Sequence, residues 1–327
     1  MKTSRIRCGL GALAAFAILA AAPLAQAAGY PEKPVTLVVP QPPGGAADAV
    51  ARPFAQALSD RLGQPVVVEN RAGANGNIAA AYVAQRPADG YTIFYGSIST
   101  LAVNPHLYKS PGFDPFKDFQ PITLTNQTPN VLVVGAQTPY QSVADVVKAA
   151  KAQPGRLAFG SAGNGNTMHL TGLQFQASTG TELVHVPYKG GPAALTDVMG
   201  GQIPMMFHNL SAVLPVAQTG KVRILAVADE KRAPLAPDVP TMAEAGAPGT
   251  VQIAWSGMLV RRGTPAPIVQ RLHQEMAAIL ATPEFRKPQE AQGSEILSST
   301  PEEFEARLKA DSRRMAEVIK AGNVHID

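Results

Sequence analysis

The sequence predicts an α/β protein of two lobes, each a mixed, mostly parallel sheet flanked by helices, with a ligand cleft between the lobes. Three observations predict this class. Short runs rich in Val, Ile and Leu alternate with Ala-rich amphipathic segments along nearly the whole chain, as in βαβ units. About 300 residues follow a short N-terminal leader, which is more than one typical domain needs. Glycine- and hydroxyl-rich corners stand at the predicted strand ends, where open α/β sheets bind ligands.

The first βαβ unit begins directly after the leader. An apolar strand is predicted over 35–39, a helix over 46–62 and a second strand over 66–69. A helix near 76–86 and a strand over 92–95 follow, and Asp89-Gly90 marks the turn between them. These elements predict the sheet and helices of the first lobe.

A second series of alternating elements begins near residue 130. A proline-rich connection over 234–248 separates this series from the last strand and the C-terminal helices. We expect one lobe to take residues 28–127 and 250–327, and the other to take 128–249, so that the chain crosses twice and forms a hinge. The predicted strands are 131–134, 157–159, 183–186, 204–207, 222–228 and 251–260, and the predicted helices are 142–152, 166–178, 191–199, 210–219, 265–281, 283–291 and 301–321.

Residues 1–27 have the layout of a secretory signal peptide. Basic residues (Lys2, Arg5 and Arg7) precede an apolar run over 9–22, and Ala25-Gln-Ala27 forms a small-residue cleavage site. The apolar run is shorter than the roughly 20 residues that a membrane-spanning helix needs, although a signal anchor is the alternative. We therefore expect a soluble, exported protein of the bacterial periplasm, cleaved near Ala27.

Charge and cysteine content exclude several classes of function. The full chain has 28 Lys and Arg against 24 Asp and Glu, and removal of the three basic leader residues leaves 25 against 24. This balance gives no reason to expect a nucleic-acid partner. The only cysteine, Cys8, lies in the leader, so a thiol nucleophile is excluded. The six histidines lack metal-ligand spacing and no Gly-x-Ser-x-Gly motif occurs, so we expect no metal, no cofactor and no catalytic residues.

The corner over 40–48 is the most informative stretch. An apolar strand runs through prolines and the glycine pair Gly44-Gly45 into a helix that carries Asp48 in its first turn. Backbone N–H groups at such a helix N-terminus favour anions. The corner lacks the Gly-Lys-Ser/Thr ending of a nucleotide phosphate loop, which favours a small organic anion over ATP. Asp48 is interpreted mainly as a cap that shapes this loop.

Four further corners resemble the first in composition. They cover 70–77, 96–100, 160–169 and 186–196, and they offer backbone N–H groups, hydroxyls and amides. Neutral donors of this kind bind carboxylates at helix N-termini. The hydroxyls of these corners either bind ligand or cap the next segment, and Tyr188 is placed on the cleft wall.

The chain resembles the substrate-binding proteins of tripartite tricarboxylate transporters, which are Bug-type periplasmic receptors. The resemblance covers essentially the whole mature chain. The motifs that carry it are Tyr30-Pro-Glu-Lys-Pro-Val35, Val39-Pro-Gln-Pro-Pro-Gly-Gly-Ala-Ala-Asp48, Val68-Glu-Asn-Arg-Ala-Gly-Ala-Asn-Gly-Asn-Ile78, Asp89-Gly-Tyr-Thr92, Asn104-Pro-His-Leu-Tyr108, Gly163-Asn-Gly-Asn-Thr-Met-His-Leu170, Val184-His-Val-Pro-Tyr-Lys-Gly190 and Asp238-Val-Pro-Thr-Met-Ala-Glu-Ala-Gly246.

The resemblance implies a type II-like periplasmic binding protein that closes on a small mono- or dicarboxylate, aromatic ones included, and delivers it to membrane permease subunits. It implies that the first loop and a loop of the second lobe hold one carboxylate through backbone groups and ordered water. We expect a monomer. A sensory protein that signals to a membrane partner is the alternative, followed by an enzyme on the same scaffold.

The residues predicted to bind ligand come from four of these corners, 40–48, 96–100, 160–169 and 186–196, together with His208. Two of them depart from the family pattern: Gln41 replaces an aromatic residue, and His208 replaces the Asp of a Phe-Asp-Asn motif. Both changes favour a more anionic ligand, or one that hydrogen-bonds at its far end. His208 is able to donate a hydrogen bond or to carry a positive charge near its ordinary pKa of about 6.5, so if it contacts an anionic ligand, affinity should fall as the pH rises from about 5.5 to 8. The full set is Gln41, Gly44, Gly45, Ala46, Asp48, Ser97, Ser99, Thr100, Ser161, Asn164, Asn166, Thr167, His169, Tyr188 and His208.

Overall fold

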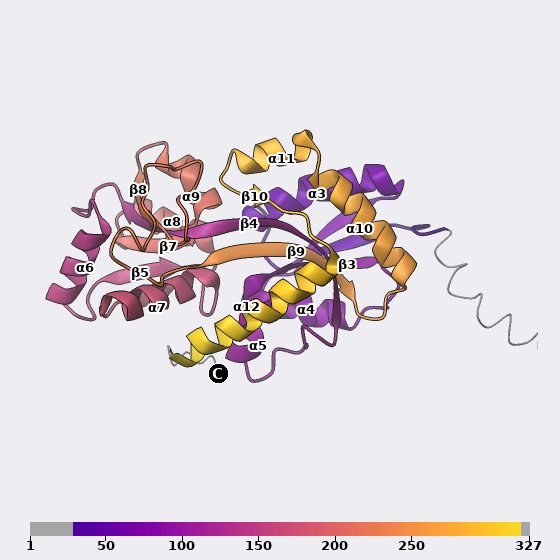
Figure 1. The fold of residues 1–327 in the computed structure, drawn as a ribbon, viewed down its shortest axis with the longest axis horizontal. Helices are drawn as coiled ribbons and strands as arrows, with labels where there is room; N and C mark the ends of the chain where they lie inside the picture. Colours follow the sequence, from indigo (N-terminus) through magenta and orange to yellow (C-terminus); the bar gives the residue numbers. More distant parts are fainter. Residues whose placement is uncertain (1–28, 322–327) are drawn as a thin grey trace, which may run out of the picture.

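A computed structural model describes residues 29–321, so the predicted signal peptide at 1–27 and its cleavage site lie outside the described residues. Ten strands form one continuous sheet in the order β2-β1-β3-β9-β4-β7-β5-β6, and β10 and β8 pair with β4 beside this path. Figure 1 shows the sheet and its helices drawn out into two halves, joined by the long strands β4 and β9. The two-lobed α/β fold predicted from the sequence is confirmed.

The first half, called lobe 1, is built on the strands that open the chain. Its sheet contains β1 (Val35–Val39), β2 (Val66–Asn70), β3 (Thr92–Ser97) and β10 (Glu295–Ile296), and shares β9 (Ile253–Arg261) and β4 (Phe119–Gly135). Its helical elements are α3 (Ala46–Leu62), η1 (Ala74–Gly76), α4 (Asn77–Ala84), η2 (Ser99–Val103), α5 (Asn104–Leu107), α10 (Ala266–Leu280), α11 (Pro283–Glu290) and α12 (Pro301–Ala321).

The second half, called lobe 2, contains β5 (Ala158–Ser161), β6 (Val184–Pro187), β7 (Met205–Asn209) and β8 (Val222–Val227). Its helices are α6 (Val143–Ala152), α7 (Thr167–Thr179), α8 (Gly191–Met199) and α9 (Leu210–Ala217). In both lobes the strands joined by helices pair in parallel, β1 with β2 and β3, and β5 with β6 and β7. Every pairing of β4 and β9 is antiparallel. The sheet is therefore more mixed than the sequence predicted, because these two strands enter each lobe from the other one.

Apolar side chains cover both faces of the sheet, which explains the continuous Val/Ile/Leu runs in the sequence. Along β1, Leu37 packs with the cluster under α3 and α10, and its neighbour Val38 packs with the cluster under α12. Along β4, Val133 and Val134 divide in the same way between the two clusters of lobe 2. This alternation follows the two-residue period of a strand. Each lobe therefore has a core on either side of the sheet.

The strand β4 differs most from its prediction. The sequence predicts only residues 131–134, whereas the strand runs from Phe119 to Gly135 through both lobes. Its first part is rich in Thr, Asn and Pro, so it lacks the apolar pattern of a buried strand. Thr123, Thr125 and Asn130 are nevertheless fully buried, because the strand passes between layers of both lobes. Hydrogen bonds with neighbouring strands and side chains make this polar burial tolerable.

Helix α7 is shared between the lobes. It follows β5 of lobe 2, but its Leu170 packs in the core cluster of lobe 1 with Trp255 and Met315. Figure 1 shows α12 running from lobe 1 towards α7. Trp255 Nε1 donates to Asp311 Oδ2 of α12 at 2.7 Å, which ties the crossing strand β9 to this helix. The lobes are thus joined by packing as well as by the chain.

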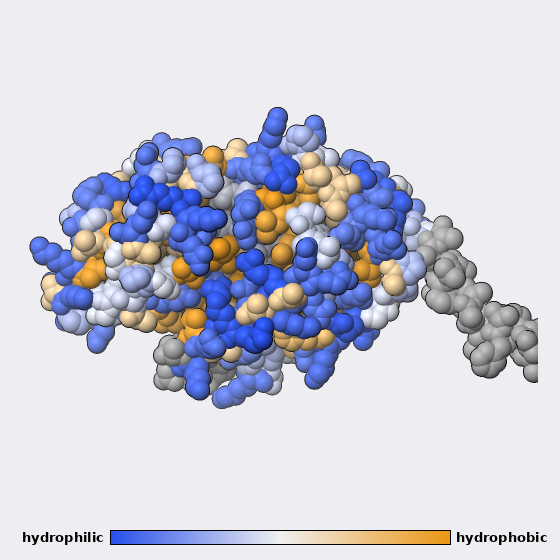
Figure 2. All heavy atoms as spheres, viewed as in Figure 1, coloured by the Kyte–Doolittle hydropathy of each residue, from blue (hydrophilic) through white to orange (hydrophobic). Residues whose placement is uncertain are grey.

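The outer face and the helices bear on whether the chain could span a membrane. Figure 2 shows one face on which hydrophilic residues dominate and hydrophobic ones form small separate patches. Within residues 29–321, no helix combines the length and the apolar character needed to cross a bilayer.

Candidate functional site

The corner between β1 and α3 is organised by Asp48. Its Oδ2 accepts hydrogen bonds from the backbone N–H of Gly44 (3.0 Å) and from Arg52 Nε (2.7 Å), and its Oδ1 accepts from Asn70 Nδ2 (3.0 Å). Asn70 Nδ2 also donates to the carbonyl of Gln41 at 3.0 Å. Burial opposes ionisation of Asp48, but the hydrogen bonds from Arg52, Gly44 and Asn70 outweigh it and hold its pKa below the ordinary value. Asp48 therefore stabilises the conformation of this loop through its hydrogen bonds.

The same corner presents the N-terminus of a 17-residue helix. Gly45 is the N-cap of α3 and supplies no side-chain cap, and Gly44 has a left-handed φ of +80° that glycine tolerates best. The first N–H groups of any helix lack partners within it, and the helix dipole makes this end attractive to anions. Five predicted ligand residues lie in this corner: Gln41, Gly44, Gly45, Ala46 and Asp48.

The corner after β2 is held by three asparagines. Asn75 Nδ2 donates to Asn104 Oδ1 at 2.7 Å, and Asn104 Nδ2 donates to the Asn75 carbonyl (3.0 Å) and to Asn77 Oδ1 (2.5 Å). Asn75 has a left-handed φ of +53° and follows Ala74 at +44°. Sequence reasoning included Asn75 and Asn77 in a corner, and Asn104 in a family motif, but gave none of them a role.

The predicted hydroxyls after β3 bind mainly to the protein itself. Ser97 Oγ accepts from the Thr100 N–H at 3.3 Å and lies 3.3 Å from Thr100 Oγ1. Thr100 is buried and its hydroxyl donates to the Asn75 carbonyl at 3.1 Å. Ser99, which is half-buried, begins η2, a π-helix. Thr100 thus stabilises the corner after β2. The π-helix η2 is of interest because single π-helical turns are frequent at functional sites.

The corner after β5 is closed by Ser161. Its Oγ donates to the Gly163 carbonyl (2.8 Å), accepts from the Gly163 N–H (3.1 Å) and lies 2.6 Å from His185 Nε2. Asn164 is exposed at the tip of the loop. Asn166 is the N-cap of α7, where its Oδ1 accepts from the His169 N–H at 3.0 Å, and Thr167 is the buried first residue of the helix. The Nδ2 of Asn166 is buried and has no hydrogen-bond partner within residues 29–321.

His169 supports this loop from inside. Its Nδ1 accepts from the Gly165 N–H at 3.1 Å, and its ring stacks on that of His185 with centroids 3.9 Å apart. Burial lowers the pKa of His169 to about 4. Burial, with a smaller contribution from His169, lowers the pKa of His185 to about 3. Both rings are therefore neutral near pH 7, and His185 is a residue that sequence reasoning missed inside a predicted strand.

Tyr188 and His208 stand at the ends of β6 and β7. The Tyr188 hydroxyl donates to Asp197 Oδ2 of α8 at 2.7 Å, and desolvation together with this contact raises the pKa of Tyr188 to about 12. His208 is 3% exposed, and its Nδ1 accepts from the Asn209 N–H at 2.7 Å. Its Nε2, which then carries the proton, packs against Gly191 and has no partner within the described part of the chain.

The expectation that His208 titrates near pH 6.5 is wrong. Burial lowers the pKa of His208 to about 4, despite an opposing contribution from the hydrogen bond with Asn209. A fully buried imidazole loses the water that would solvate its charge, and no carboxylate in the described residues replaces it with an ion pair. His208 is therefore a neutral hydrogen-bond donor across the physiological pH range.

The structure brings the five corners together. A Cβ placed on Gly76 would collide with Thr100 Oγ1 and lie 3.1 Å from Pro40 Cβ, so the three corners of lobe 1 meet there. Asn75 Nδ2 donates to the carbonyl of Gly165 in lobe 2 at 3.3 Å. Within lobe 2, the Tyr188 N–H donates to the Ser161 carbonyl at 3.0 Å, which joins the remaining two corners. Residues far apart in the sequence thus form one continuous polar region between the lobes.

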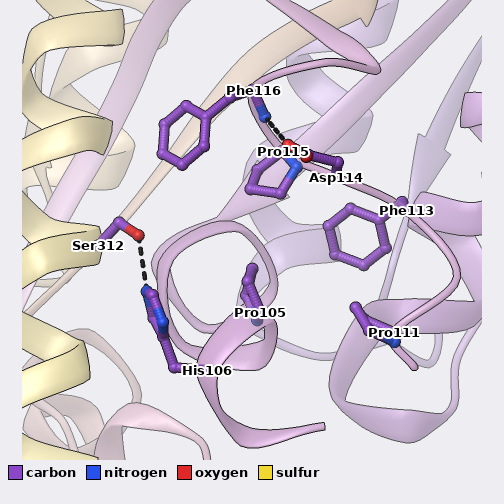
Figure 3. Close-up of a pocket in the computed structure, with 8 residues that line it drawn as sticks. All are labelled: Pro105, His106, Pro111, Phe113, Asp114, Pro115, Phe116 and Ser312. Atoms are coloured by element: carbon purple, nitrogen blue, oxygen red, sulfur yellow. Dashed lines mark hydrogen bonds between the residues drawn. The ribbon is translucent and has the colours of Figure 1, made fainter. Parts of the chain in front are cut away.

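Two surface pockets lie away from this region. One, of about 250 Å³, is lined by Pro105, His106, Pro111, Phe113, Asp114, Pro115, Phe116 and Ser312, and a neighbouring one of about 320 Å³ shares Phe116 and Ser312 with it. Figure 3 shows the first, with His106 of α5 directed at Ser312 of α12, at 2.8 Å between Nε2 and Oγ. None of the predicted ligand residues lines either pocket. Within residues 29–321, no cluster of three His, Cys, Asp or Glu residues has the arrangement of a metal site.

Comparison with known proteins gives consistent matches over most of the chain. The sequence profile of the tripartite tricarboxylate transporter family receptor (TctC) matches residues 50–324. A curated relative, the UPF0065 protein in the tcbD-tcbE intergenic region of Pseudomonas sp. (strain P51), is 37% identical over 291 residues, which cover 89% of this chain and 86% of the relative.

Two solved structures are similar along their whole length. R. palustris Rpa4515 with adipate has a TM-score of 0.87 and 38% identity, covering 90% of this chain and 99% of that chain. MatC (Rpa3494) from Rhodopseudomonas palustris with bound malate has a TM-score of 0.83 and 30% identity, covering 89% of this chain and 100% of that chain.

Proposed function

Because this chain belongs to the tripartite tricarboxylate transporter receptor family, we propose that it is a periplasmic receptor that binds a small carboxylate between its lobes and delivers it to the membrane subunits of such a transporter. The adipate and malate held by two similar structures are both small dicarboxylates. We take mono- and dicarboxylates as the ligand class, and we propose that the receptor acts as a monomer. The proposed ligand residues are those predicted from the sequence in four of the corners, together with His208.

One observation carries the choice of a carboxylate. Asn166 Nδ2 and His208 Nε2 are buried N–H donors without a partner in the described residues. Parallel pairing of β5 with β7 places both at the same edge of the lobe 2 sheet. A buried donor without an acceptor costs about 1–3 kcal/mol, so two at one edge favour a ligand that only accepts hydrogen bonds. An ionised carboxylate is such a group.

The charged groups around the first corner support the same choice. Arg52 is paired with Asp48 and Arg71 with Glu69, so these guanidinium groups are already engaged. The anion would then meet amides, hydroxyls and helix N-termini. Neutral donors hold a carboxylate without a formal ion pair, which suits a receptor that must release its ligand again.

Within the polar region between the lobes, the Ser161–His185 contact is an arrangement that resembles catalytic machinery. A serine nucleophile needs a neighbouring base that is able to take its proton near the working pH. Ser161 is fully buried, its hydroxyl is engaged with Gly163, and the pKa of His185 is lowered to about 3. A base this weak is unsuited to the task, so we propose binding without turnover.

A ligand panel tests the proposed function. The mature chain would be unfolded and refolded to remove carried ligand, and then melted with aliphatic, hydroxy and aromatic mono- and dicarboxylates, adipate and malate included. We expect saturable stabilisation by at least one acid, of about 2.7 kcal/mol at a concentration 100 times Kd, with the acid recovered chemically unchanged. Absence of any stabilisation across the panel contradicts carboxylate binding, and conversion of a bound acid contradicts a pure receptor.

A further inference from the structure

We propose that Asn75 is a positioning residue that latches lobe 1 onto the loop between β5 and α7 of lobe 2 through the Gly165 carbonyl, and that this latch holds the two lobes in the relation that the structure shows. The latch itself rests on contacts between described residues. Only its effect on affinity rests on the proposed carboxylate binding.

The backbone of Asn75 is the first sign of a special role. Ala74 and Asn75 both have φ in the left-handed region, at +44° and +53°. Residues other than glycine seldom adopt this conformation, and consecutive ones persist only where their surroundings impose it. Here the neighbouring glycines, Gly73 and Gly76, also have positive φ values. The whole turn is therefore built to present the residue at its tip in one direction.

Buried polar side chains hold that direction. Asn104 is fully buried and pairs with Asn75 twice, accepting from its side-chain amide and donating to its carbonyl. The Thr100 hydroxyl donates to the same carbonyl. An asparagine amide has two N–H donors, and Asn104 takes one of them. The second reaches the carbonyl of Gly165 in lobe 2, at 3.3 Å between the heavy atoms.

Asn75 binds the peptide unit that directly precedes the side chain of Asn166, the N-cap residue of α7. The Gly165 carbonyl and the N–H of Asn166 belong to one peptide group, and Asn166 carries the unpartnered Nδ2 described above. His169 fixes Gly165 from the other side, through its N–H. Gly165 is thus held by lobe 2 at its nitrogen and by lobe 1 at its oxygen. A change in the relation of the lobes must break this contact or turn the peptide that positions Asn166.

The packing of α7 against lobe 1 strengthens the effect of the Asn75–Gly165 hydrogen bond on the loop. Leu170, one turn beyond Asn166, packs in the core cluster of lobe 1. The Asn75–Gly165 hydrogen bond therefore acts at the end of a helix that is already seated against lobe 1. A single contact there selects one arrangement of the loop, because the helix behind it leaves little freedom for others.

Three variants separate a latch from a merely structural asparagine. Asn75→Gly removes the side chain but suits the left-handed backbone, so the fold is expected to remain stable. Asn75→Asp keeps the shape and replaces both N–H donors by acceptors that face carbonyl oxygens. Gln85→Ala, at the exposed end of the neighbouring helix α4, is the matched control.

Spin labels report the relation of the lobes directly. Cysteines for the labels replace Val67 and Val184, two exposed side chains on β2 and β6 at opposite ends of the sheet. The only cysteine of the sequence, Cys8, lies in the predicted leader, so the mature chain would carry no other label. Without added acid, we expect electron–electron distance distributions that are broader and shifted in Asn75→Gly and Asn75→Asp, but unchanged in Gln85→Ala. Unchanged distributions in both Asn75 variants, with folding confirmed by thermal melts, would overturn the latch.

Adipate, or the strongest acid from the panel, then tests the consequence for binding. Loss of one interlobe hydrogen bond should raise koff about three- to tenfold in Asn75→Gly and leave kon nearly unchanged. An unaltered koff would overturn the effect on affinity. If no acid binds even the unsubstituted protein, the proposed function fails, while the spin-label distances still decide whether the latch exists.

Discussion

The imidazole rings of His169 and His185 lie 3.9 Å apart and within 12° of parallel, beneath the loop that joins β5 to α7. Each ring contacts that loop, His169 through the Gly165 N–H and His185 through Ser161 Oγ. The ring of buried Phe159 also stacks with His185, at 5.0 Å between centroids, so the pair has an apolar neighbour. The loop therefore rests on two neutral rings, and protonation of either one disturbs it.

The free energy of unfolding should fall in acid because of these histidines. The pKa values of His169, His185 and His208 are lowered to between about 3 and 4 from the ordinary 6.5, so the unfolded chain binds more protons than the native protein below pH 6.5. Their contribution is fully present above pH 6.5 and is lost as pH falls towards 4. The loss is about 1.4 kcal/mol per pH unit for each of the buried rings of His169 and His208, and less for half-buried His185, which solvent screens. Urea unfolding from pH 7.5 to 4.5 measures the slope, and His169→Gln should reduce it. An unchanged slope would show that His169 is not buried neutral.

Asp48→Asn should weaken the first corner and ligand binding together. The substitution keeps the shape but leaves one acceptor oxygen for Gly44, Arg52 and Asn70, which donate to two different oxygens of Asp48, so an amide N–H must face at least one of these donors. The ion pair with half-exposed Arg52 contributes little, so we attribute the expected loss of about 1–3 kcal/mol in unfolding free energy to the mispaired buried donors. Urea unfolding and calorimetric titration with adipate measure the two effects. Asp60→Asn, exposed on the same helix, is the control and should change neither.

His208 should act through hydrogen bonding and not through charge. With its pKa lowered to about 4, the ring stays neutral between pH 5.5 and 8, and its contribution to affinity should be flat over that range. His208→Asp removes the buried Nε2–H donor and places a carboxylate beside the bound anion, so Kd should rise tenfold or more. Titrations at three pH values with both proteins test this. Equal affinity of the two proteins would place His208 outside the binding site.

Asp311→Ala should destabilise the crossing between the lobes. Its buried carboxylate accepts from Trp255 Nε1 and pairs with Arg307 and Arg314 at 2.8 and 3.1 Å. Removal leaves the indole N–H without a partner and two guanidinium groups without their anion, at a cost of about 2–4 kcal/mol. Urea unfolding followed by the fluorescence of Trp255, the only tryptophan, measures the loss. Glu317→Ala, exposed on the same helix, should be nearly neutral, and an equal loss there would argue against this specific role.

Most of the fold could be predicted because its elements carry clear periodic patterns. The strand at 35–39 and the helices at 46–62 and 301–321 have the predicted bounds. The first part of β4 could not be predicted, because its Thr, Asn and Pro residues are buried by tertiary packing and not by their own hydrophobicity. The π-helix η2 has no apolar period that would indicate it.

The candidate site was predictable as a set of corners but not as a network. Glycines and amides at strand ends indicated which loops to consider. The Asn75–Asn104 and Asn75–Gly165 contacts join residues 29 and 90 positions apart, and no local pattern indicates such pairs. The sequence singles out His208 as a departure from the family pattern, but its pKa depends on burial, which only the folded chain creates.

The continuous strand β4 limits how this protein can be recombined with its relatives. Residues 119–135 pair with β9 and β10 at one end and with β7 and β8 at the other, so any cut near residue 128 divides a strand that both lobes use. A chimera that takes lobe 2 from a relative should fold only if all of β4 and the facing part of β9 come from one parent. We therefore expect the two lobes to unfold together, and ligand specificity to be exchanged more safely one corner at a time than by swapping a lobe.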